Sequence, residues 1–184
     1  MNGSVLLRPA RPGEAALLSG LALRSKAHWG YDAAFLAACR EELSLTEDEL
    51  GARRTSVAEV GGTVVGFGTL EGEPPTGEIG MLFVDPAAIG RGIGRALLAR
   101  LVETARANGF VRLRIEADPY AEEFYLAQGA VRVGEIASGS VPGRALPLLE
   151  LAVGDTGGDT GGDTDRDTDR EEGVTDVGGR VHGG

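Results

Sequence analysis

Apolar residues recur along the chain in two spacings, one typical of strands and one typical of helices. Alternating or continuous apolar runs predict strands at residues 5–8, 55–60, 63–70, 78–84, 111–116, 130–136 and 146–153. Helical spacing appears in residues 14–29, 32–43 and 118–128, and in a long segment that ends at Asn108-Gly109. The predicted order is β-α-α-β-β-β-α-β-α-β-β. This is an α/β domain with a mixed (α+β) sheet and one strand-helix-strand crossover at residues 79–116.

Local signals support several of these elements. Gly61-Gly62 separates two strand patterns and predicts a hairpin turn. Asp32 stands where a side chain can cap the second helix. Cys39 follows the apolar run Leu36-Ala37-Ala38, so we interpret it as a packing residue rather than a nucleophile.

The hydrophobic pattern stops near residue 153. Residues 154–184 hold 10 of the 30 glycines and carry 9 acidic against 3 basic residues. Their GDT repeats lack the apolar residue that a calcium-loaded β-roll needs in each turn, and without apolar residues a segment cannot offset the entropy of ordering. We therefore predict a domain at residues 1–153 and a disordered acidic Gly/Asp/Thr-rich tail at 154–184.

Charge and composition exclude several classes of protein. The net charge of −10 argues against nucleic-acid binding, and no apolar run is long enough to cross a membrane. A single cysteine excludes an internal disulfide and a cysteine-built zinc site, and no other metal site is predicted. With no signal-peptide pattern at the start, we expect a cytoplasmic protein.

Candidate chemistry concentrates in the crossover. The apolar strand that ends at Asp85-Pro86 is followed by Gly90-Arg91-Gly92-Ile93-Gly94-Arg95, which runs directly into the long helix. Glycines at alternate positions let the backbone approach a ligand, and the N-terminus of a helix favours an anion. A phosphate or pyrophosphate fits this turn, although neither the dinucleotide nor the nucleoside-triphosphate fingerprint is present. A glycine-rich turn that only packs helix on strand is the structural alternative.

This segment resembles the acetyl-CoA pyrophosphate loop of the GNAT N-acetyltransferase superfamily. Downstream, Asp118-Pro119-Tyr120-Ala121 through Tyr125 to Gly129 resembles the second motif of that family, an Asn-x-x-Ala-x-x-x-Tyr helix that ends in glycine. The resemblance covers roughly residues 4–153. Two positions depart from the family pattern: Ile89 replaces a Gln or Arg, and Asp118 replaces the Asn.

The resemblance implies acetyl-CoA as co-substrate, with no metal. The residues that it implies for cofactor binding are Leu82, Phe83, Val84, Ile89, Gly90, Arg91, Gly92, Ile93, Gly94, Arg95, Asp118 and Phe124. The backbone of the first three is expected to polarise the thioester carbonyl and to pair with the pantetheine arm.

The resemblance also implies two catalytic residues. Glu78 stands fourteen residues before Gly92, where the family often places a general base, and Tyr125 matches the tyrosine that serves as general acid. Glu78 as a surface carboxylate at a strand end, and Tyr125 as a wall of the cofactor slot, are the alternatives.

The acceptor site is less clear from sequence. His28, Trp29 and Tyr31 join the first two helices, where the family often builds its acceptor pocket, and His28 is a second candidate for the base. These residues equally fit a packed helix-helix corner.

We expect an amine of a small molecule or peptide as acceptor, in a monomer or homodimer. The alternative function is a non-catalytic acyl-CoA-binding regulatory module whose acidic tail binds a partner.

Overall fold

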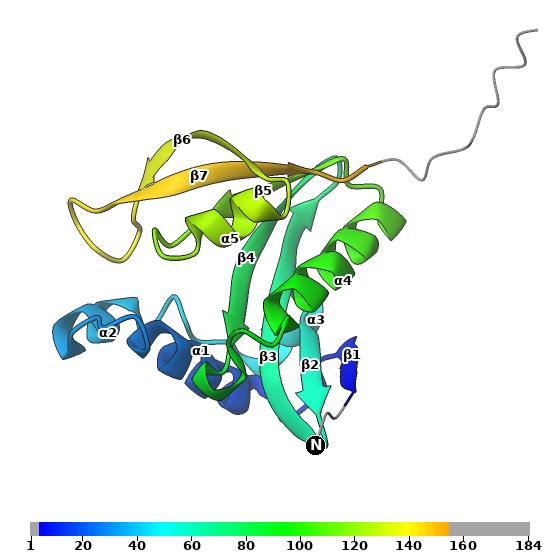
Figure 1. Ribbon diagram of the computed structural model, residues 1–184, viewed down its shortest axis with the longest axis horizontal. Helices are drawn as coiled ribbons and strands as arrows, with labels where there is room; N and C mark the ends of the chain where they lie inside the picture. The colour runs from blue at the N-terminus through cyan, green and yellow to red at the C-terminus, as the bar shows by residue number, and fades with distance from the viewer. Residues whose placement is uncertain (1–3, 155–184) are drawn as a thin grey trace, which may run out of the picture.

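Seven strands form a single sheet in the computed structural model, which describes residues 4–154 (Figure 1). The strands are β1 (Val5–Pro9), β2 (Ser56–Val60), β3 (Thr63–Glu73), β4 (Thr76–Val84), β5 (Arg112–Glu116), β6 (Val131–Ala137) and β7 (Ala145–Ala152). Their order is β1-β2-β3-β4-β5-β7-β6, and every pair is antiparallel except β4 with β5. The predicted mixed sheet and its crossover are therefore confirmed.

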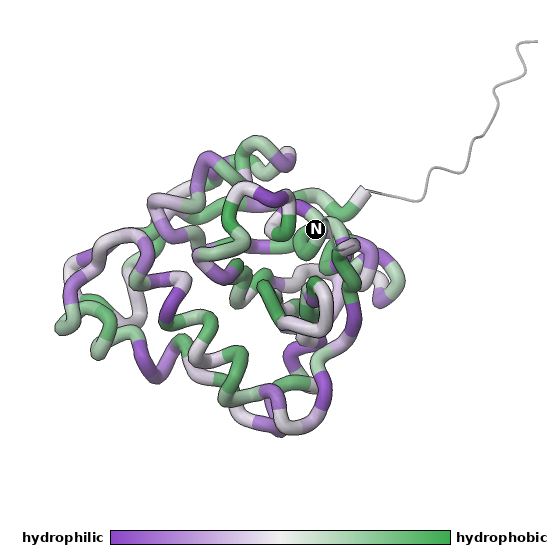
Figure 2. The backbone as a smooth tube through the Cα atoms, turned by 60° about the horizontal axis from the view of Figure 1, so that its bottom comes forward, coloured by the Kyte–Doolittle hydropathy of each residue, from purple (hydrophilic) through white to green (hydrophobic). Residues whose placement is uncertain are grey.

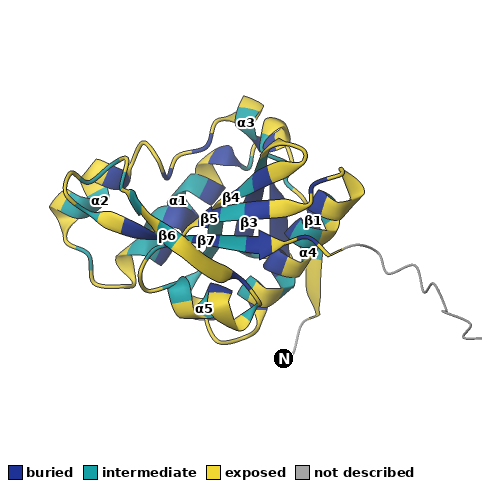
Figure 3. Cartoon of the chain, turned by 90° about the horizontal axis from the view of Figure 1, so that it is seen from above, coloured by how far each residue is buried: buried dark blue, intermediate teal, exposed yellow. Residues whose placement is uncertain are grey.

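Helices cover both faces of this sheet. They are α1 (Ala15–Ala27), α2 (Ala33–Cys39), α3 (Glu47–Ala52), α4 (Ile93–Ala107) and α5 (Glu122–Ala127), with a 3₁₀ turn η1 (Pro86–Ala88). The first three pack on one face around Phe67, whereas α4 and α5 pack on the other around Leu101 and Leu149. Hydrophobic and hydrophilic stretches alternate along the chain (Figure 2), and the buried residues concentrate on the central strands (Figure 3).

The region between α1 and β2 differs from the prediction. The second helix begins at the predicted cap, where the Asp32 carboxylate accepts from the Phe35 N–H, but it ends at Cys39 and not at Leu43. The sequence pattern missed α3, which is short and buries only Leu50. A capping box at Thr46 and Glu49 begins this helix, so its signal lay in the cap and not in apolar spacing.

Strands β4 and β5 lie side by side only at their first residues. Three parallel pairs join them, the last between Glu78 and Arg114. Beyond that pair the strands part, and Figure 1 shows β5, β7 and β6 turning away from β4. The edge of β4 from Ile79 onward is therefore open toward the gap.

The sequence also makes predictions for Cys39, for the acidic tail and for membrane-spanning segments. Cys39 is 2% exposed and its Sγ lies 3.4 Å from Ser140 Oγ, which confirms its packing role. The predicted acidic tail lies almost entirely outside the described residues. Within residues 4–154, none of the helices is long and apolar enough to span a bilayer.

Candidate active site

A cavity of about 490 Å³ opens where β4 and β5 part. Its walls come from the open edge of β4, the glycine turn before α4, the start of α5 and the end of α1. Most of the residues predicted for cofactor binding line it, namely Leu82, Phe83, Val84, Ile89, Gly90, Gly92, Ile93, Gly94, Arg95, Asp118 and Phe124. Residues of both predicted motifs therefore border the same cavity.

The open edge of β4 offers backbone groups to this cavity. In an antiparallel pair, alternate residues turn their N–H and C=O groups toward the partner strand. The Asp85 N–H donates to the Val65 carbonyl oxygen at 2.8 Å, so Asp85 turns its backbone groups toward β3. Going back along β4, Phe83 has the same orientation as Asp85, and Val84 and Leu82 have the opposite one. Leu82 and Val84 therefore turn their backbone N–H and C=O groups toward the gap, whereas Phe83 turns its groups toward Phe67 of β3.

The turn before α4 has the backbone of an anion site. Gly90 and Gly92 have φ of +80° and +77°, a left-handed conformation that glycine adopts without steric cost. A Cβ at either position would meet nothing within 4 Å, so the space around this backbone is open. Gly92 is the N-cap of α4, a 15-residue helix whose dipole favours negative charge at this end.

Positive charge lies beside this turn. Arg95 lines the cavity, and Arg91 is exposed on the turn itself, outside the cavity lining. Phe124 of α5 faces the turn, because its ring lies 3.4 Å from where a Cβ on Gly94 would stand. A negatively charged ligand at the turn would therefore meet backbone N–H groups, an arginine and an aromatic wall.

Tyr125 occupies the wall formed by α5. The residue is buried, packs in the core with Ile79 and Leu82 of β4, and still lines the cavity. Burial raises the pKa of its phenol, because the charged phenolate is disfavoured away from water. Tyr125 therefore keeps its proton at neutral pH and remains an O–H donor.

Glu78 sits where β4 and β5 separate. It is half-buried, and burial together with the carboxylates of Glu116 and Glu71 raises its pKa. Glu78 does not itself line the cavity, but Glu116 of β5 does. A carboxylate with a raised pKa accepts a proton more readily near neutrality, which suits a general base.

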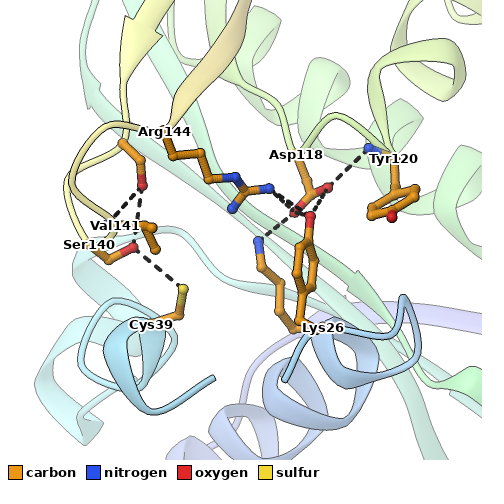
Figure 4. A network of polar contacts seen from close by, with 9 residues as sticks. Lys26, Cys39, Asp118, Tyr120, Ser140, Val141 and Arg144 are labelled. Carbon is orange, nitrogen blue, oxygen red and sulfur yellow. Dashed lines mark hydrogen bonds and ion pairs between the residues drawn. The ribbon is translucent and has the colours of Figure 1, made fainter. Parts of the chain in front are cut away.

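Asp118 is held by residues from three separate segments (Figure 4). Its carboxylate accepts from Lys26 Nζ at 2.7 Å, from Tyr31 OH at 3.0 Å and from Arg144 Nη2 at 3.3 Å. Burial raises the pKa of this carboxyl, but the hydrogen bond from Lys26 and that from the Tyr120 N–H outweigh it, so the pKa is lowered. We call Lys26, Tyr31, Asp118 and Arg144 the Asp118 cluster.

The three aromatic residues predicted for the acceptor site separate in the structure. Trp29 lines the cavity and stacks on Tyr120, with ring centroids 5.3 Å apart and an interplanar angle of 9°. Tyr31 turns its hydroxyl into the Asp118 cluster. His28 is exposed, meets the Trp29 ring edge-on, and is not part of the cavity lining.

Sequence reasoning placed no side chain beside Asp118, although Tyr31 is predicted for the acceptor site. Lys26 is the only lysine, and Arg144 stands in the polar loop between the last two strands, which the sequence offers as a candidate substrate contact. Glu116 was visible only as a polar position of an alternating strand. Among the described residues, no group of three or more His, Cys, Asp or Glu is arranged to hold a metal ion.

Comparison with known proteins places this site in context. The model of the acetyltransferase (GNAT) family matches residues 23–130. An IAA acetyltransferase of Azospirillum brasilense is 44% identical over 69 residues, which make up 36% of this chain and 45% of that protein. The match therefore spans less than half the length of this relative.

Similar solved structures extend over most of the chain. A GCN5-related N-acetyltransferase from Rhodopseudomonas palustris is 28% identical with a TM-score of 0.68, covering 83% of this chain and 98% of that one. The PaiA N-acetyltransferase of Thermoplasma acidophilum, in complex with coenzyme A, is 19% identical with a TM-score of 0.68, covering 81% and 99%. The second likeness is one of fold.

Proposed function

The chain belongs to the acetyltransferase (GNAT) family, and we propose that it transfers an acetyl group from acetyl-CoA to a primary amine of a small molecule or peptide. One observation carries the proposal. The open edge of β4, the glycine turn before α4 and the hydroxyl-bearing Tyr125 all border a single cavity. A thioester with a pyrophosphate-bearing arm needs these three elements together.

The residues present fit acetyl-CoA. The left-handed backbone at Gly90 and Gly92, with open space where a side chain would stand, suits the pyrophosphate at the start of α4. The backbone groups of Leu82 and Val84, which turn away from β3, suit the amides of the pantetheine arm and the carbonyl of the acetyl group. Asp118 is committed to its own cluster, so we assign it no contact with a phosphate.

Glu78 supplies the base in the proposed reaction. An alkylammonium with a pKa of about 10.4 must lose a proton before it attacks, which costs about 4–5 kcal/mol near neutral pH. Glu78 accepts that proton, directly or through water, and its raised pKa makes it a stronger base than an ordinary glutamate. Glu116, which borders the cavity, keeps negative charge beside the incoming cationic amine.

Tyr125 supplies the acid. Acetyl-CoA brings an acetyl group already activated as a thioester. As the new N–C bond forms and the C–S bond breaks, the departing sulfur gains negative charge. The buried O–H of Tyr125 donates to that sulfur, and the proton that Glu78 removed from the amine goes to solvent. The ammonium gives up two protons in all: Glu78 accepts the first before the attack, and the nitrogen releases the second as the amide forms, which restores the proton that Tyr125 gave to sulfur. The products are the amide, the free thiol and one proton in solvent, so the reaction balances.

Thiol release tests the proposal. The full chain is mixed with acetyl-CoA and a panel of amines, amino acids and peptides, and free thiol is followed with a chromogenic disulfide. Faster thiol release in the presence of an acceptor supports acetyl transfer and rules out the alternative of a non-catalytic acyl-CoA-binding module. Acetyl-CoA binding by calorimetry without acceptor-dependent thiol release would overturn the catalytic role.

A further inference from the structure

The Asp118 cluster holds more positive charge than negative. Lys26 and Arg144 both pair with Asp118, and the side chains of all three are between 13% and 17% exposed. Tyr31 does not supply a second negative charge, because burial and the Asp118 carboxylate raise the pKa of its hydroxyl to about 12. Within residues 4–154, no other carboxylate lies within 4 Å of Lys26 or Arg144.

The cluster also holds unused hydrogen-bond donors. Arg144 directs only Nη2 at Asp118 and Tyr31, and among the described residues its Nε and Nη1 donate to no protein atom. Lys26 makes a single hydrogen bond, although an ammonium carries three N–H donors. The rings of Tyr31 and Phe35 face both cations and compensate part of their charge, with Arg144 5.1 and 4.7 Å from the two ring centroids. The donors that remain unused suit an anionic oxygen ligand.

Two members of the Asp118 cluster border the cavity, whereas Arg144 and Tyr31 are not part of its lining. Lys26 and Asp118 line the cavity, as does Glu116, which stands two residues before Asp118 at the end of β5. Glu78 belongs to the last joined pair of the two strands, and Glu116 stands beyond that pair at the end of β5. The cavity wall carries the ammonium of Lys26 together with the carboxylates of Glu42, Glu116 and Asp118.

An aromatic pair lines the same cavity. Trp29 and Tyr120 stack on each other and both line the cavity, although they are 41% and 55% exposed. Exposed stacked rings beside a cavity suit the apolar part of a ligand. A molecule with an amine, a carboxylate and an apolar body would meet a matching surface at each part.

We propose that the acceptor is an amino acid, whose carboxylate binds Lys26 and Arg144 while its amine lies toward Glu78 and Glu116. The inference rests on the proposed acetyl transfer and narrows its acceptor. It treats Arg144 as a specificity residue that reads the carboxylate. The product is the N-acetyl amino acid, with the free thiol as the other product.

Matched pairs of substrates test this inference. Thiol release is measured with the protein amino acids and with their carboxamides, which keep the amine and the side chain but lack the anion. The carboxamide has more neutral amine at neutral pH, because it lacks the carboxylate whose negative charge raises the pKa of the neighbouring ammonium. Amine reactivity alone therefore favours the carboxamide. A higher kcat/KM for the amino acid than for its carboxamide would show that the protein recognises the carboxylate.

Arg144→Gln and Lys26→Met are compared with the parent chain. The control is Arg112→Gln, which removes an arginine from an exposed pair with Glu150 at the start of β5. We expect the best amino acid to exceed its carboxamide in kcat/KM by about 10–100-fold in the parent and the control. Each test variant should lose most of that ratio, because the KM of the acid rises by much more than the KM of its carboxamide.

The outcomes separate the two proposals. Equal or better kcat/KM for the carboxamides throughout the panel would overturn the inference and leave acetyl transfer intact. A ratio that survives in both test variants would also overturn it, since another residue would then read the carboxylate. If neither series releases thiol while another amine or a peptide does, the inference fails and acetyl transfer stands. If nothing in the wider panel of amines, amino acids and peptides releases thiol, both proposals fail.

Discussion

Gly92 offers a direct test of the predicted pyrophosphate site, because two nearly isosteric side chains separate charge from backbone strain. Gly92→Asn and Gly92→Asp place side chains of almost equal shape at a φ of +77°. Asn and Asp both tolerate the left-handed conformation better than other non-glycine residues, so the two variants share a similar backbone cost. They differ in one negative charge.

That charge should act in opposite directions on folding and on binding. At the N-cap of α4 a carboxylate interacts favourably with the helix dipole, by about 0.3–1 kcal/mol. The Asp variant should therefore melt at the same temperature as the Asn variant or slightly higher. Against a bound pyrophosphate, two like charges about 4 Å apart repel by about 4 kcal/mol in surroundings of intermediate dielectric constant. The expected loss of acetyl-CoA affinity is about 10²–10³-fold relative to Asn.

Calorimetry with acetyl-CoA and thermal melts of both variants measure these effects. Repeating the titration at high ionic strength should narrow the gap between Asp and Asn, because salt screens charges near the surface. Acetyl-CoA affinities within threefold of each other would show that no phosphate lies near Gly92. A gap that accompanies a large drop in melting temperature would instead indicate a folding defect.

Four other predictions concern the acid, the base, the domain boundary and the Asp118 cluster. Tyr125→Phe should lower turnover about 10²–10⁴-fold with acetyl-CoA affinity little changed, and a rate within twofold of the parent would eliminate Tyr125 as the acid. In the parent, kcat/KM should fall as pH drops through the raised pKa of Glu78, because the base must be ionised. Glu78→Gln should show its largest deficit above that pKa and below the pKa of the amine, and should recover as pH rises further. A pH-independent deficit would contradict the base role. A chain ending at Gly154, which keeps the 2.7 Å contact from Arg106 Nε to Gly154 O, should retain its melting temperature and acetyl-CoA affinity, whereas a drop of many degrees would mean that the domain extends further. Asp118→Asn should lower the free energy of unfolding by about 1–3 kcal/mol at pH 7. Because the pKa of Asp118 is lowered in the folded chain, its contribution to stability is present above the ordinary pKa of 3.8 and is lost as pH falls through the lowered pKa. Parent and variant should therefore converge in stability in acid, and a pH-independent difference would contradict a role of the charge.

The site was predicted from sequence to an uneven degree. The turn at Gly90 and Gly92 and the wall at Phe124 lie on the cavity, since both belong to motifs of contiguous residues. Asp118 belongs to such a motif, and its role as a cofactor residue stays a prediction. The structure adds that its carboxylate pairs with Lys26 and Arg144. A motif specifies which residue stands at a position, but not which distant side chain neutralises it.

The sequence by itself determined the strands, the helical stripe of α4 and the crossover, because these depend on local periodicity and on turn residues a few positions apart. The packing of Leu97 and Leu101 in the core was predictable for the same reason. Only the tertiary structure decided that β4 and β5 separate after Glu78, since pairing between strands depends on the packing of the whole sheet. It also decided the Asp118 cluster, in which Lys26 reaches across 92 residues of chain. Such contacts carry no local signal, because an ion pair constrains where two side chains meet in space and leaves the sequence around each of them free.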